Sequence, residues 1–497
     1  MNSFPKHRFR LALCAMLLFP FLVKAQTFPD PPQPWQDAYR ISLLGFRFSH
    51  PMTVIDRAEL EQIKQRISGK VEPQQTAYTQ LLAEAAVQLN FVPDAPYTMH
   101  IMGGYEPNSN LDEMRDWLWR NCHAAYTCGL AYALTGDPIY AEKAREVLMD
   151  WANRMTTFTG GDRGLQLGSW FSPMLYAADL IYDYPAWTSS ERINFNYWWR
   201  NNCLVHTIDV MRHKDNNWKD AGLLGVMAAA AVLEDTLLLK EGLIQLKSYF
   251  FSRTDSNVEL PGPGWKIKKD SHGVYLPREV VRNDGSSGLT YTAYALTTMT
   301  QCLEIARYAG FNFWHEATEE GATIQELIEQ YFRWDIENNP FPWHSHPKKS
   351  TKRRNCYELA NVHFTLEASM RNWIQSHRPQ VGREGDEYIT LNKGDLLVAS
   401  AIPSESSPPL RIFKLYQNFP NPFNSVTTIR YQLLKSSHTS LAVYDILGQE
   451  IASLVNEYQN EGQYQVPWNA MDLPGGIYFY RLRAVGLSET KKLILQK

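Results

Sequence analysis

Residues 265–310 read WKIKKDSHGVYLPREVVRNDGSSGLTYTAYALTTMTQCLEIARYAG, a cationic segment followed by a turn and then a helical pattern. The turn, NDGSSG at 283–288, has residues that favour turns at nearly every position. After it, residues recur at alternating four- and three-residue spacing, which predicts one face of a helix over 287–309: Tyr291, Ala295, Thr298, Cys302 and Ile305.

Tyr291 is expected in the first turn of this helix, a few residues after Arg278 and Arg282. Guanidinium groups can neutralise an acidic sugar, and a phenol beside them can move one proton. The stretch therefore predicts a catalytic site for an acidic carbohydrate. The same residues also fit a packing tyrosine beside a solvated cationic face.

A long series of helical patterns surrounds this stretch, from Asp56 to about Trp373. Capping signals mark several starts, including a capping box at Thr188–Glu191 and a proline after Asp137. The expected helices are 56–68, 74–90, 110–135, 138–155, 166–183, 189–212, 219–232, 236–252, 287–309, 315–336 and 355–373. Helices in antiparallel succession, without strands between them, predict a mainly α fold: an α/α toroid, in the form of an incomplete barrel of helical hairpins.

The periodicity changes to two after residue 410. The segments TTIRYQL, TSLAVYD, GQYQVPW, GIYFYRLRA and TKKLILQ are short strand patterns, and they predict a small C-terminal β-sandwich domain at 411–497. The Pro- and Ser-rich run SAIPSESSPPL at 400–410 predicts a linker, which we place at 398–410. The helical domain is accordingly expected at 26–397.

Residues 1–25 have the pattern of a secretory signal peptide. Lys6, Arg8 and Arg10 precede an apolar run, and Ala25 suits a small-residue cleavage site. No later apolar stretch is long enough to cross a bilayer, so we expect an exported chain without a transmembrane segment. Cleavage leaves five cysteines, with no CxxC pair and no Cys/His cluster, so neither a metal nor another cofactor is expected.

The charge distribution bears on the class of partner. The chain has a formal net charge of −3, and removal of the four signal-peptide cations makes it more acidic. A net acidic protein is a poor ligand for nucleic acid. Its cations are nevertheless gathered at 266–282 and in the run HSHPKKSTKRR at 344–354, and this arrangement fits an anionic polysaccharide.

Two further polar stretches carry candidate site residues. In MRHKDNNWKDAG at 211–222, Asn216 and Asn217 can donate uncharged amide hydrogens, and Trp218 offers a surface for stacking. An asparagine helix cap followed by a core tryptophan would look the same. In WLWRNCHAAYTC at 117–128, Arg120 and His123 fall on one helical turn, and a satisfied core histidine is the alternative there.

These stretches resemble the alginate lyase superfamily of α/α-toroid polysaccharide lyases, families 5 and 38 especially. The resemblance runs from about 117 to 397 and is carried by AYALTGDPIYAEKA, LYAADLIYDYPAWTSSE, DNNWKDAG, YELANVHF and the segment from PREVVRND to GLTYTAYAL. It implies a β-eliminating lyase that acts on uronic-acid polymers, such as alginate (polymannuronate) or glucuronan, and leaves unsaturated uronate ends.

The resemblance also implies roles for individual residues. Tyr291 matches the family's catalytic tyrosine in position, Arg282 its arginine partner, and Asn217 the asparagine that neutralises the substrate carboxylate. In family 5 a histidine follows this asparagine, but Trp218 stands there in this chain. His272, in the same cationic loop, is therefore the fourth catalytic candidate. The candidates for substrate binding are Asn216, Trp218, Arg120, His123, Arg278, His344 and Lys348.

The C-terminal module resembles the type 9 secretion (Por) C-terminal sorting domain. The resemblance is carried by LYQNFPNPFNSVTTIRY, VYDILGQEI, LVNEYQNEGQYQVPWNA and LPGGIYFYRLRA. It implies recognition by the type 9 secretion machinery, passage through the periplasm and export across the outer membrane to give a secreted or cell-surface protein. It implies no catalytic role for 411–497.

Two other functions stay open at this point. An α/α-barrel glycoside hydrolase needs two opposed carboxylic acids, and the chain offers Asp215, Asp220, Asp270, Glu279 and Asp284. A non-catalytic secreted glycan-binding protein is the other possibility. Elimination leaves an unsaturated product that absorbs ultraviolet light, hydrolysis does not, and a binding protein produces neither change.

Overall fold

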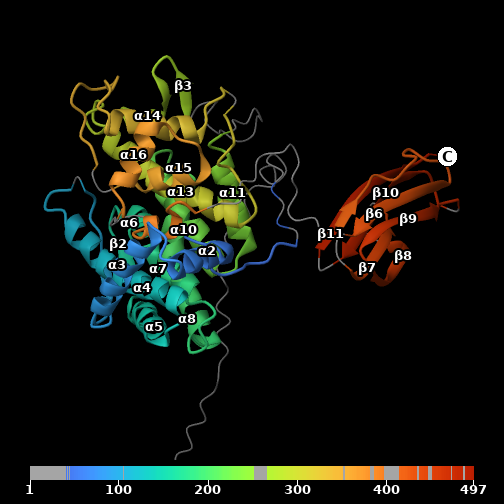
Figure 1. Ribbon diagram of the computed structural model, residues 1–497, viewed down its shortest axis with the longest axis horizontal. Coiled ribbons are helices and arrows are strands. Elements are labelled where there is room, and N and C mark those ends of the chain that lie inside the picture. Colours follow the sequence, from blue (N-terminus) through green and yellow to red (C-terminus); the bar gives the residue numbers. More distant parts are fainter. Residues whose placement is uncertain are drawn as a thin grey trace, which may run out of the picture. The chain divides into compact units, whose positions relative to one another are not determined.

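The computed structural model describes residues 41–496, except 42, 44, 105, 251–265, 319, 351–352, 381–385, 397–412, 434–435, 446–449, 472 and 485–486. The signal peptide predicted at 1–25 and the linker predicted at 398–410 lie outside these residues. Between 41 and 396 the described chain is mainly helical, and from 413 onward it consists of strands and turns (Figure 1).

The elements of the helical part follow the predicted series of helices. Its first half contains α2 (Arg57–Ser68), α3 (Gln74–Gln88), β1 (Thr98–His100), α4 (Leu111–Thr135), α5 (Pro138–Arg154), β2 (Thr157–Thr159), α6 (Arg163–Ser169), α7 (Pro173–Leu180) and α8 (Ser189–Trp199). Its second half contains the π-helix η1 (Arg200–Leu204), α9 (Val205–His213), α10 (Asn217–Val232), α11 (Thr236–Lys247), β3 (Lys268–Asp270), β4 (Gly273–Tyr275), α12 (Pro277–Val280), α13 (Gly288–Tyr308), α14 (Ile324–Asp335), α15 (Asn355–His363), α16 (Ala368–Ser376) and α17 (Ile389–Lys393). The mainly α fold is confirmed, but the expectation of no strands between the helices was wrong: β1 pairs with β2 and β3 with β4 in two small sheets.

Some predicted boundaries were wrong. The helix predicted at 166–183 is two helices, because the chain breaks after Ser169 and restarts at Pro173, whose ring suits a first helical position. The helix predicted at 355–373 is also divided, into α15 and α16. The helix predicted at 315–336 begins only at Ile324, where Thr323 and Glu326 form a capping box.

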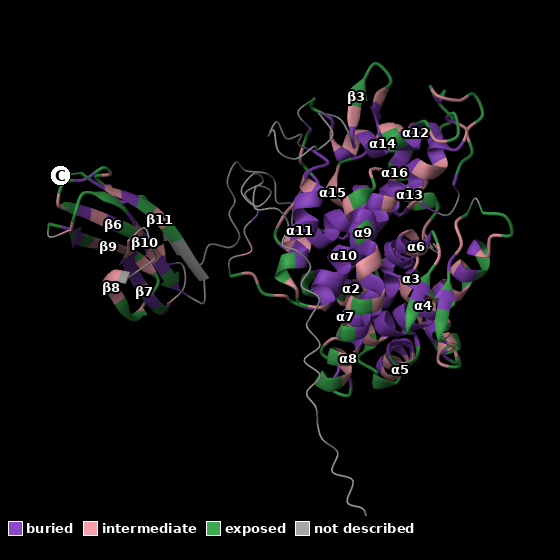
Figure 2. Ribbon diagram, turned by 180° about the vertical axis from the view of Figure 1, so that it is seen from behind, coloured by how far each residue is buried: buried purple, intermediate pink, exposed green. Residues whose placement is uncertain are grey.

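Helix α10 is the central helix of this part. All of its residues except Trp218 are buried, and it packs against α6, α7, α9, α11 and α13 (Figure 2). It lies between α5 and α8 on one side and α14 and α16 on the other (Figures 1 and 2). Gly222 allows this packing, because a Cβ there would lie 2.6 Å from the Thr207 carbonyl oxygen of α9. The close contact fixes the position of the helix start at Asn217.

A buried ion network joins the first described helix to the last. Lys393 of α17 donates to Glu59 of α2 at 2.7 Å and to Glu304 of α13 at 2.7 Å. Arg307 also pairs with both carboxylates, and His363 lies 2.7 Å from Glu304. Segments that are far apart in sequence are thereby held together within the helical part.

The C-terminal part is a β-sandwich of two antiparallel sheets. One sheet has the strand order β11-β10-β7-β8 and the other β5-β6-β9. The strands are β5 (Phe413–Leu415), β6 (Val426–Leu433), β7 (Ser437–Tyr444), β8 (Glu450–Gln459), β9 (Gly462–Asn469), β10 (Gly476–Ala484) and β11 (Leu487–Leu495). Inward-facing residues of both sheets share one apolar core, which includes Ile429, Tyr431, Leu441, Trp468 and Tyr480. This confirms the predicted β-sandwich.

Among the described residues, five cysteines are buried and none of them forms a disulfide: Cys122, Cys128, Cys203, Cys302 and Cys356. They serve as small apolar side chains in the core. Among the described residues, no helix has both the length and the apolar character that a bilayer span requires.

Candidate active site

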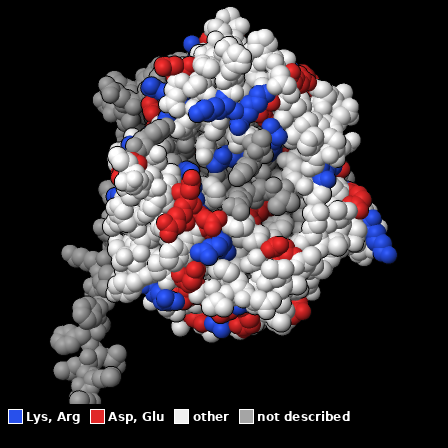
Figure 3. All heavy atoms as spheres, turned by 90° about the vertical axis from the view of Figure 1, so that its left-hand side faces the viewer, with Lys and Arg blue, Asp and Glu red and all other residues white. Residues whose placement is uncertain are grey.

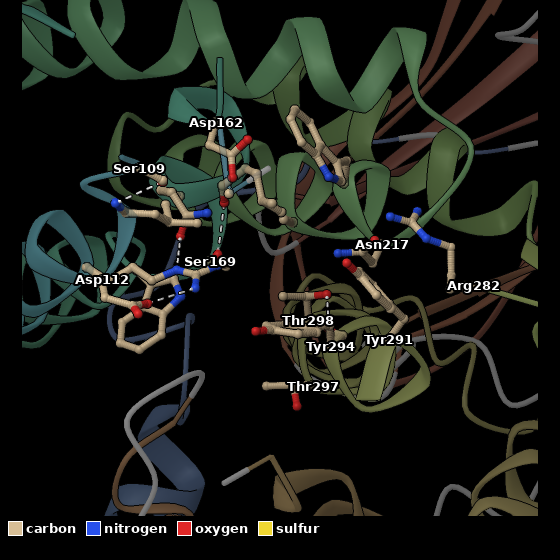
Figure 4. Close-up of a pocket in the computed structure, with 18 residues that line it drawn as sticks. Ser109, Asp112, Asp162, Ser169, Asn217, Arg282, Tyr291, Tyr294, Thr297 and Thr298 are labelled. Carbon is tan, nitrogen blue, oxygen red and sulfur yellow. Dashed lines mark hydrogen bonds and ion pairs between the residues drawn. The ribbon is translucent and has the colours of Figure 1, made fainter. Parts of the chain in front are cut away.

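A cavity of about 350 Å³ opens where α4, α6, α10 and α13 approach one another. The segment after α12 completes its wall. Figure 4 shows Asn217, Arg282 and Tyr291 at one end and Ser109, Asp112, Asp162 and Ser169 at the other. The remaining lining residues are Gly104, Leu111, Arg115, Leu165, Gln166, Trp170, Trp218, Ala221, Tyr294, Thr297 and Thr298.

Three predicted catalytic residues meet at one end of this cavity. The guanidinium carbon of Arg282 lies 4.2 Å from the centre of the Tyr291 ring. Asn217 is 3% exposed, and its side-chain oxygen has no hydrogen-bond partner among the described residues. A buried polar atom of this kind is costly unless a ligand satisfies it. The end of the cavity therefore combines a cation, a phenol and an amide whose oxygen can accept a hydrogen bond from a ligand.

The helix start explains how Asn217 reaches the cavity. The side chain of Asn216 accepts a hydrogen bond from the backbone N–H of Trp218 at 3.1 Å and so caps α10. Asn216 does not line the cavity, so the structure gives it the capping role that the sequence had left as an alternative. Asn217 and Trp218 follow as the first residues of the helix, and both line the cavity.

A buried charge cluster lies behind Asn217 and Arg282. Lys266 is 2.6 Å from Asp220 and 3.9 Å from Glu279, and Tyr249 donates to Asp220 at 2.8 Å. Burial raises the pKa of Glu279 to about 7, and the nearby Lys266 and Arg282 charges and the backbone N–H of Asn217 partly oppose this rise. The cluster thus connects the start of α10 to the segment that carries Arg282.

The opposite end of the cavity is rich in hydrogen-bond donors. Arg115 donates to the Gln166 side-chain oxygen at 3.0 Å, and its guanidinium lies 5.7 Å from the centre of the Trp170 ring. The side-chain nitrogens of Gln166 and Trp170 have no partner among the described residues. Burial also raises the pKa of Asp162, and the Arg115 charge opposes it. This end can accordingly bind the oxygens of a sugar.

The sequence did not single out these four residues. Gln166 and Trp170 lie in RGLQLGSW, which has the ordinary pattern of an amphipathic helix. Arg115 lies on the preceding long helix, and Asp162 precedes α6. An aromatic residue close to two polar ones was the available signal, and it is too common to identify a site.

The basic run at 344–354 has several different roles. The Arg353 guanidinium is buried 3.4 Å from the centre of the Tyr294 ring, and burial lowers its pKa to about 10 although Tyr294 opposes this. Arg354 pairs with Asp335 at 3.0 Å, and Lys349 bonds the Asp335 carbonyl. Lys348 is exposed, and its backbone bonds Ser286 and Thr290 at 2.7 and 2.9 Å. These bonds place its backbone beside the start of α13.

Three further predicted residues, from the cationic segment at 266–282 and from the basic run, do not line the cavity. His272 lies on the β3–β4 hairpin, where it is 3.0 Å from Asp270 and its ring centre is 5.5 Å from that of Trp343. Arg278 is exposed and pairs with Asp215 at 3.1 Å. His344 accepts from the backbone N–H of His346 at 3.0 Å. Closeness in sequence did not bring these side chains to Tyr291.

Arg120 and His123 also lie outside this cavity. Arg120 pairs with Asp94 at 3.5 Å. His123 lies between Glu84, at 3.0 Å, and Glu387, and its ring stacks on Trp119. Burial lowers the pKa of His123, but the two carboxylates outweigh it and raise the value overall. These contacts match the alternative of a core histidine whose ring nitrogens both have hydrogen-bond partners.

Neither the acids considered for hydrolysis nor a metal centre is found at the cavity. Asp220 and Glu279 belong to the buried cluster, and Asp215, Asp270 and Asp284 are not among the lining residues. Within the described ranges, no three His, Cys, Asp or Glu side chains are arranged to hold a metal ion.

On the face in Figure 3, Lys and Arg gather above a central hollow, and Asp and Glu lie mainly below it.

Comparisons with known proteins agree with this arrangement of elements. A family model described as alginate lyase matches residues 62–343, and one described as secretion system C-terminal sorting domain matches 417–496. A search of curated proteins gives no match.

Two solved structures are similar in fold. An alginate lyase from Bacteroides ovatus has a TM-score of 0.52 at 17% identity, over 69% of this chain and 99% of that one. A tyrosine-to-phenylalanine variant of alginate lyase A1-III, from Sphingomonas species A1, complexed with a tetrasaccharide, has a TM-score of 0.51 at 16% identity, over 66% of this chain and 93% of that one. At these identities the likeness concerns the fold alone.

The family match covers more than half of the chain and includes Asn217, Arg282 and Tyr291. The second match coincides with the β-sandwich and indicates secretion by the type 9 system to the cell surface or beyond. The protein is thus a secreted polysaccharide lyase: the chain belongs to the alginate lyase family and carries a secretion system C-terminal sorting domain.

Proposed function

We propose that the protein cleaves a uronic-acid polymer, alginate (polymannuronate) or glucuronan, by β-elimination, with Tyr291 as both base and acid. The observation that carries this proposal is the meeting of Asn217, Arg282 and Tyr291 at one end of the cavity. A cation and an amide beside a phenol are the groups that abstraction of a proton next to a carboxylate requires.

The reaction follows from the chemistry of the substrate. The C5 proton of a uronate is not acidic while its carboxylate carries a full charge. Arg282 and the Asn217 amide bind the carboxylate, so that electron density can move onto it as the C5 proton leaves. The C4–O4 bond then breaks, a C4–C5 double bond forms, and O4 takes up a proton as it departs.

Tyr291 serves both proton transfers. The ordinary pKa of a phenol is about 10, and the positive charge of Arg282, 4.2 Å from the ring centre, favours the phenolate. The phenolate takes the C5 proton, and the resulting phenol gives a proton to O4. In mannuronate and glucuronate the C5 hydrogen and O4 lie on the same side of the ring, so one residue can reach both.

This mechanism assigns no proton transfer to a histidine. Trp218 stands where the resemblance to family 5 calls for one, and His272 lies on a hairpin with Asp270. The donor-rich end of the cavity, with Arg115, Gln166 and Trp170, then binds a neighbouring sugar. Trp170 can stack on its ring while the two polar side chains bind its oxygens.

Purified protein incubated with a panel of uronans tests the proposal. We expect ultraviolet absorbance to rise as reducing ends appear, with polymannuronate and glucuronan as the leading substrates. Reducing ends without absorbance would instead identify a hydrolase, for which Asp112 and Asp162 are the acids that line the cavity. Binding without either signal would identify a glycan-binding protein.

A further inference from the structure

A second, smaller hollow lies beside the main cavity. Its volume is about 120 Å³, and it is lined by Arg163, His206, Asp209, Lys214 and Trp218 together with Val210 and two glycines. Trp218 also lines the main cavity, so its side chain forms part of the wall of both spaces. The two spaces are therefore neighbours that share one wall residue.

The basic side chains of this hollow are held in place by their own contacts. Arg163 donates to the Gly160 carbonyl at 2.5 Å and, through Nε, to His206 Nδ1 at 3.1 Å. Because Nδ1 of His206 accepts this bond, the neutral ring carries its proton on Nε2 and offers a donor there. Burial and the Arg163 charge lower the pKa of His206 to about 4, which keeps the ring neutral at neutral pH.

The charges of the hollow favour an anion. Lys214 lies 5.3 Å from the centre of the Trp218 ring, and it adds a second cation to Arg163. The single acid, Asp209, is well exposed and pairs with His213 at 2.9 Å. A carboxylate would thus meet two cations and a neutral donor, and the opposing acid is solvated and has a partner of its own.

We propose that this hollow binds the carboxylate of a second uronate in the substrate, adjacent to the sugar at Tyr291, with Trp218 as the stacking surface between them. The inference rests on the proposed function and deepens it: the enzyme recognises the carboxylates of two consecutive uronates, one at Arg282 and one in this hollow. The tryptophan that replaces the expected histidine thereby gains a role in binding.

Substitutions combined with altered substrates test this inference. We compare Lys214→Gln and the double variant Arg163→Gln/Lys214→Gln on the preferred uronan and on the same polymer with part of its carboxylates reduced to neutral sugars. On the native polymer we expect the KM of the double variant to rise about tenfold or more, with kcat little changed, since charged hydrogen bonds are lost. On the reduced polymer the difference from wild type should shrink. Arg57→Gln, which removes an exposed cation paired with Asp183, is the matched control.

An unchanged KM, or the same ratio on both polymers, would overturn the inference. Lys214→Gln alone decides if the double variant fails to fold, because Lys214 is exposed. If wild type cleaves no uronan, the proposed function fails, and calorimetry with short oligouronates then examines the hollow separately. Tighter binding to wild type than to Lys214→Gln would support a carboxylate site, and equal affinity would exclude one.

Discussion

Arg282 and Tyr291 lie on opposite sides of one turn, and the guanidinium carbon of Arg282 is 4.2 Å from the centre of the Tyr291 ring. Arg282 follows the short helix α12, and Tyr291 is in the first turn of α13. A cation over an aromatic face is attracted to it and favours a negative charge on the phenol oxygen. The two residues belong to different helical segments, so each can be substituted separately.

Tyr291→Phe should nearly abolish turnover. The substitution keeps the ring, its contact with Arg282 and the helix start, and it removes only the hydroxyl. Removal of a general acid or base costs ~100–10,000-fold, and Tyr291 would act twice, so we expect kcat to fall by the upper end of this range while substrate still binds. Initial rates from ultraviolet absorbance measure kcat, and retention of more than about a tenth of it contradicts the role.

His272→Ala is the companion experiment. We expect only a mild loss of activity, because His272 lies on the β3–β4 hairpin with Asp270 and does not line the cavity. A loss of kcat as large as that of Tyr291→Phe would show that a histidine acts as the base.

Arg282→Lys should be severely impaired even though it keeps the charge. A point ammonium cannot reproduce the planar fork of donors that binds a carboxylate with two parallel bonds. Loss of one such stabilising group typically costs on the order of 100-fold in kcat. Steady-state kinetics on the preferred uronan provide the measurement, and near-normal kcat would rule out carboxylate neutralisation by this residue.

Glu279→Gln should change the pH dependence of stability. The pKa of Glu279 is about 7 in the folded protein and 4.5 ordinarily, so the folded state holds a proton that the unfolded chain releases between these values. Wild-type stability should therefore fall as pH rises from 4.5 to 7 and level off above, with a contribution of at most about 3 kcal/mol. The variant lacks this contribution. Denaturation midpoints of both proteins, measured from pH 4.5 to 7, test this prediction. If the two midpoints changed with pH in parallel, the prediction would be wrong.

Lys348→Ala should weaken substrate binding, whereas Arg353→Ala should lower stability. Lys348 is exposed beside the start of α13, so its loss should raise KM for the polyanion, and added salt should reduce the effect. Arg353 is buried against Tyr294, so its loss should lower the free energy of unfolding by about 2 kcal/mol or more. KM at two salt concentrations and denaturation curves separate the two. An equal effect of both substitutions on KM would contradict this division and show that both side chains bind the polyanion.

A chain that ends at Ser400 should retain lyase activity and lose secretion. The β-sandwich has its own apolar core, and the cavity is lined entirely by residues of the helical part. We expect full activity in the purified shortened protein and no export to the cell surface of a host with a type 9 system. A folded but inactive product would show that the predicted domain boundary is wrong.

The sequence predicted best those residues of the candidate site that lie at helix starts and turns. It singled out Asn217, Arg282 and Tyr291 because each lies at a helix start or beside a turn, where polar motifs are easy to recognise. His272 and Arg278 were grouped with them by sequence proximity, but His272 lies on the β3–β4 hairpin and Arg278 pairs with Asp215, so neither lines the cavity. Gln166 and Trp170 reach the cavity because α6 packs on α10, and such long-range packing leaves no local pattern in the sequence.

The ion network around Lys393 has a consequence for how the chain matures. Glu59 and Lys393 are 334 residues apart, and the buried Glu59 and Glu304 carboxylates stay without this cation until the chain has been made almost to the end of its helical part. Pairings at such separation form late and slowly. An incomplete chain therefore lacks its closing interaction, and the helical part can complete this network only once residue 393 is available to it.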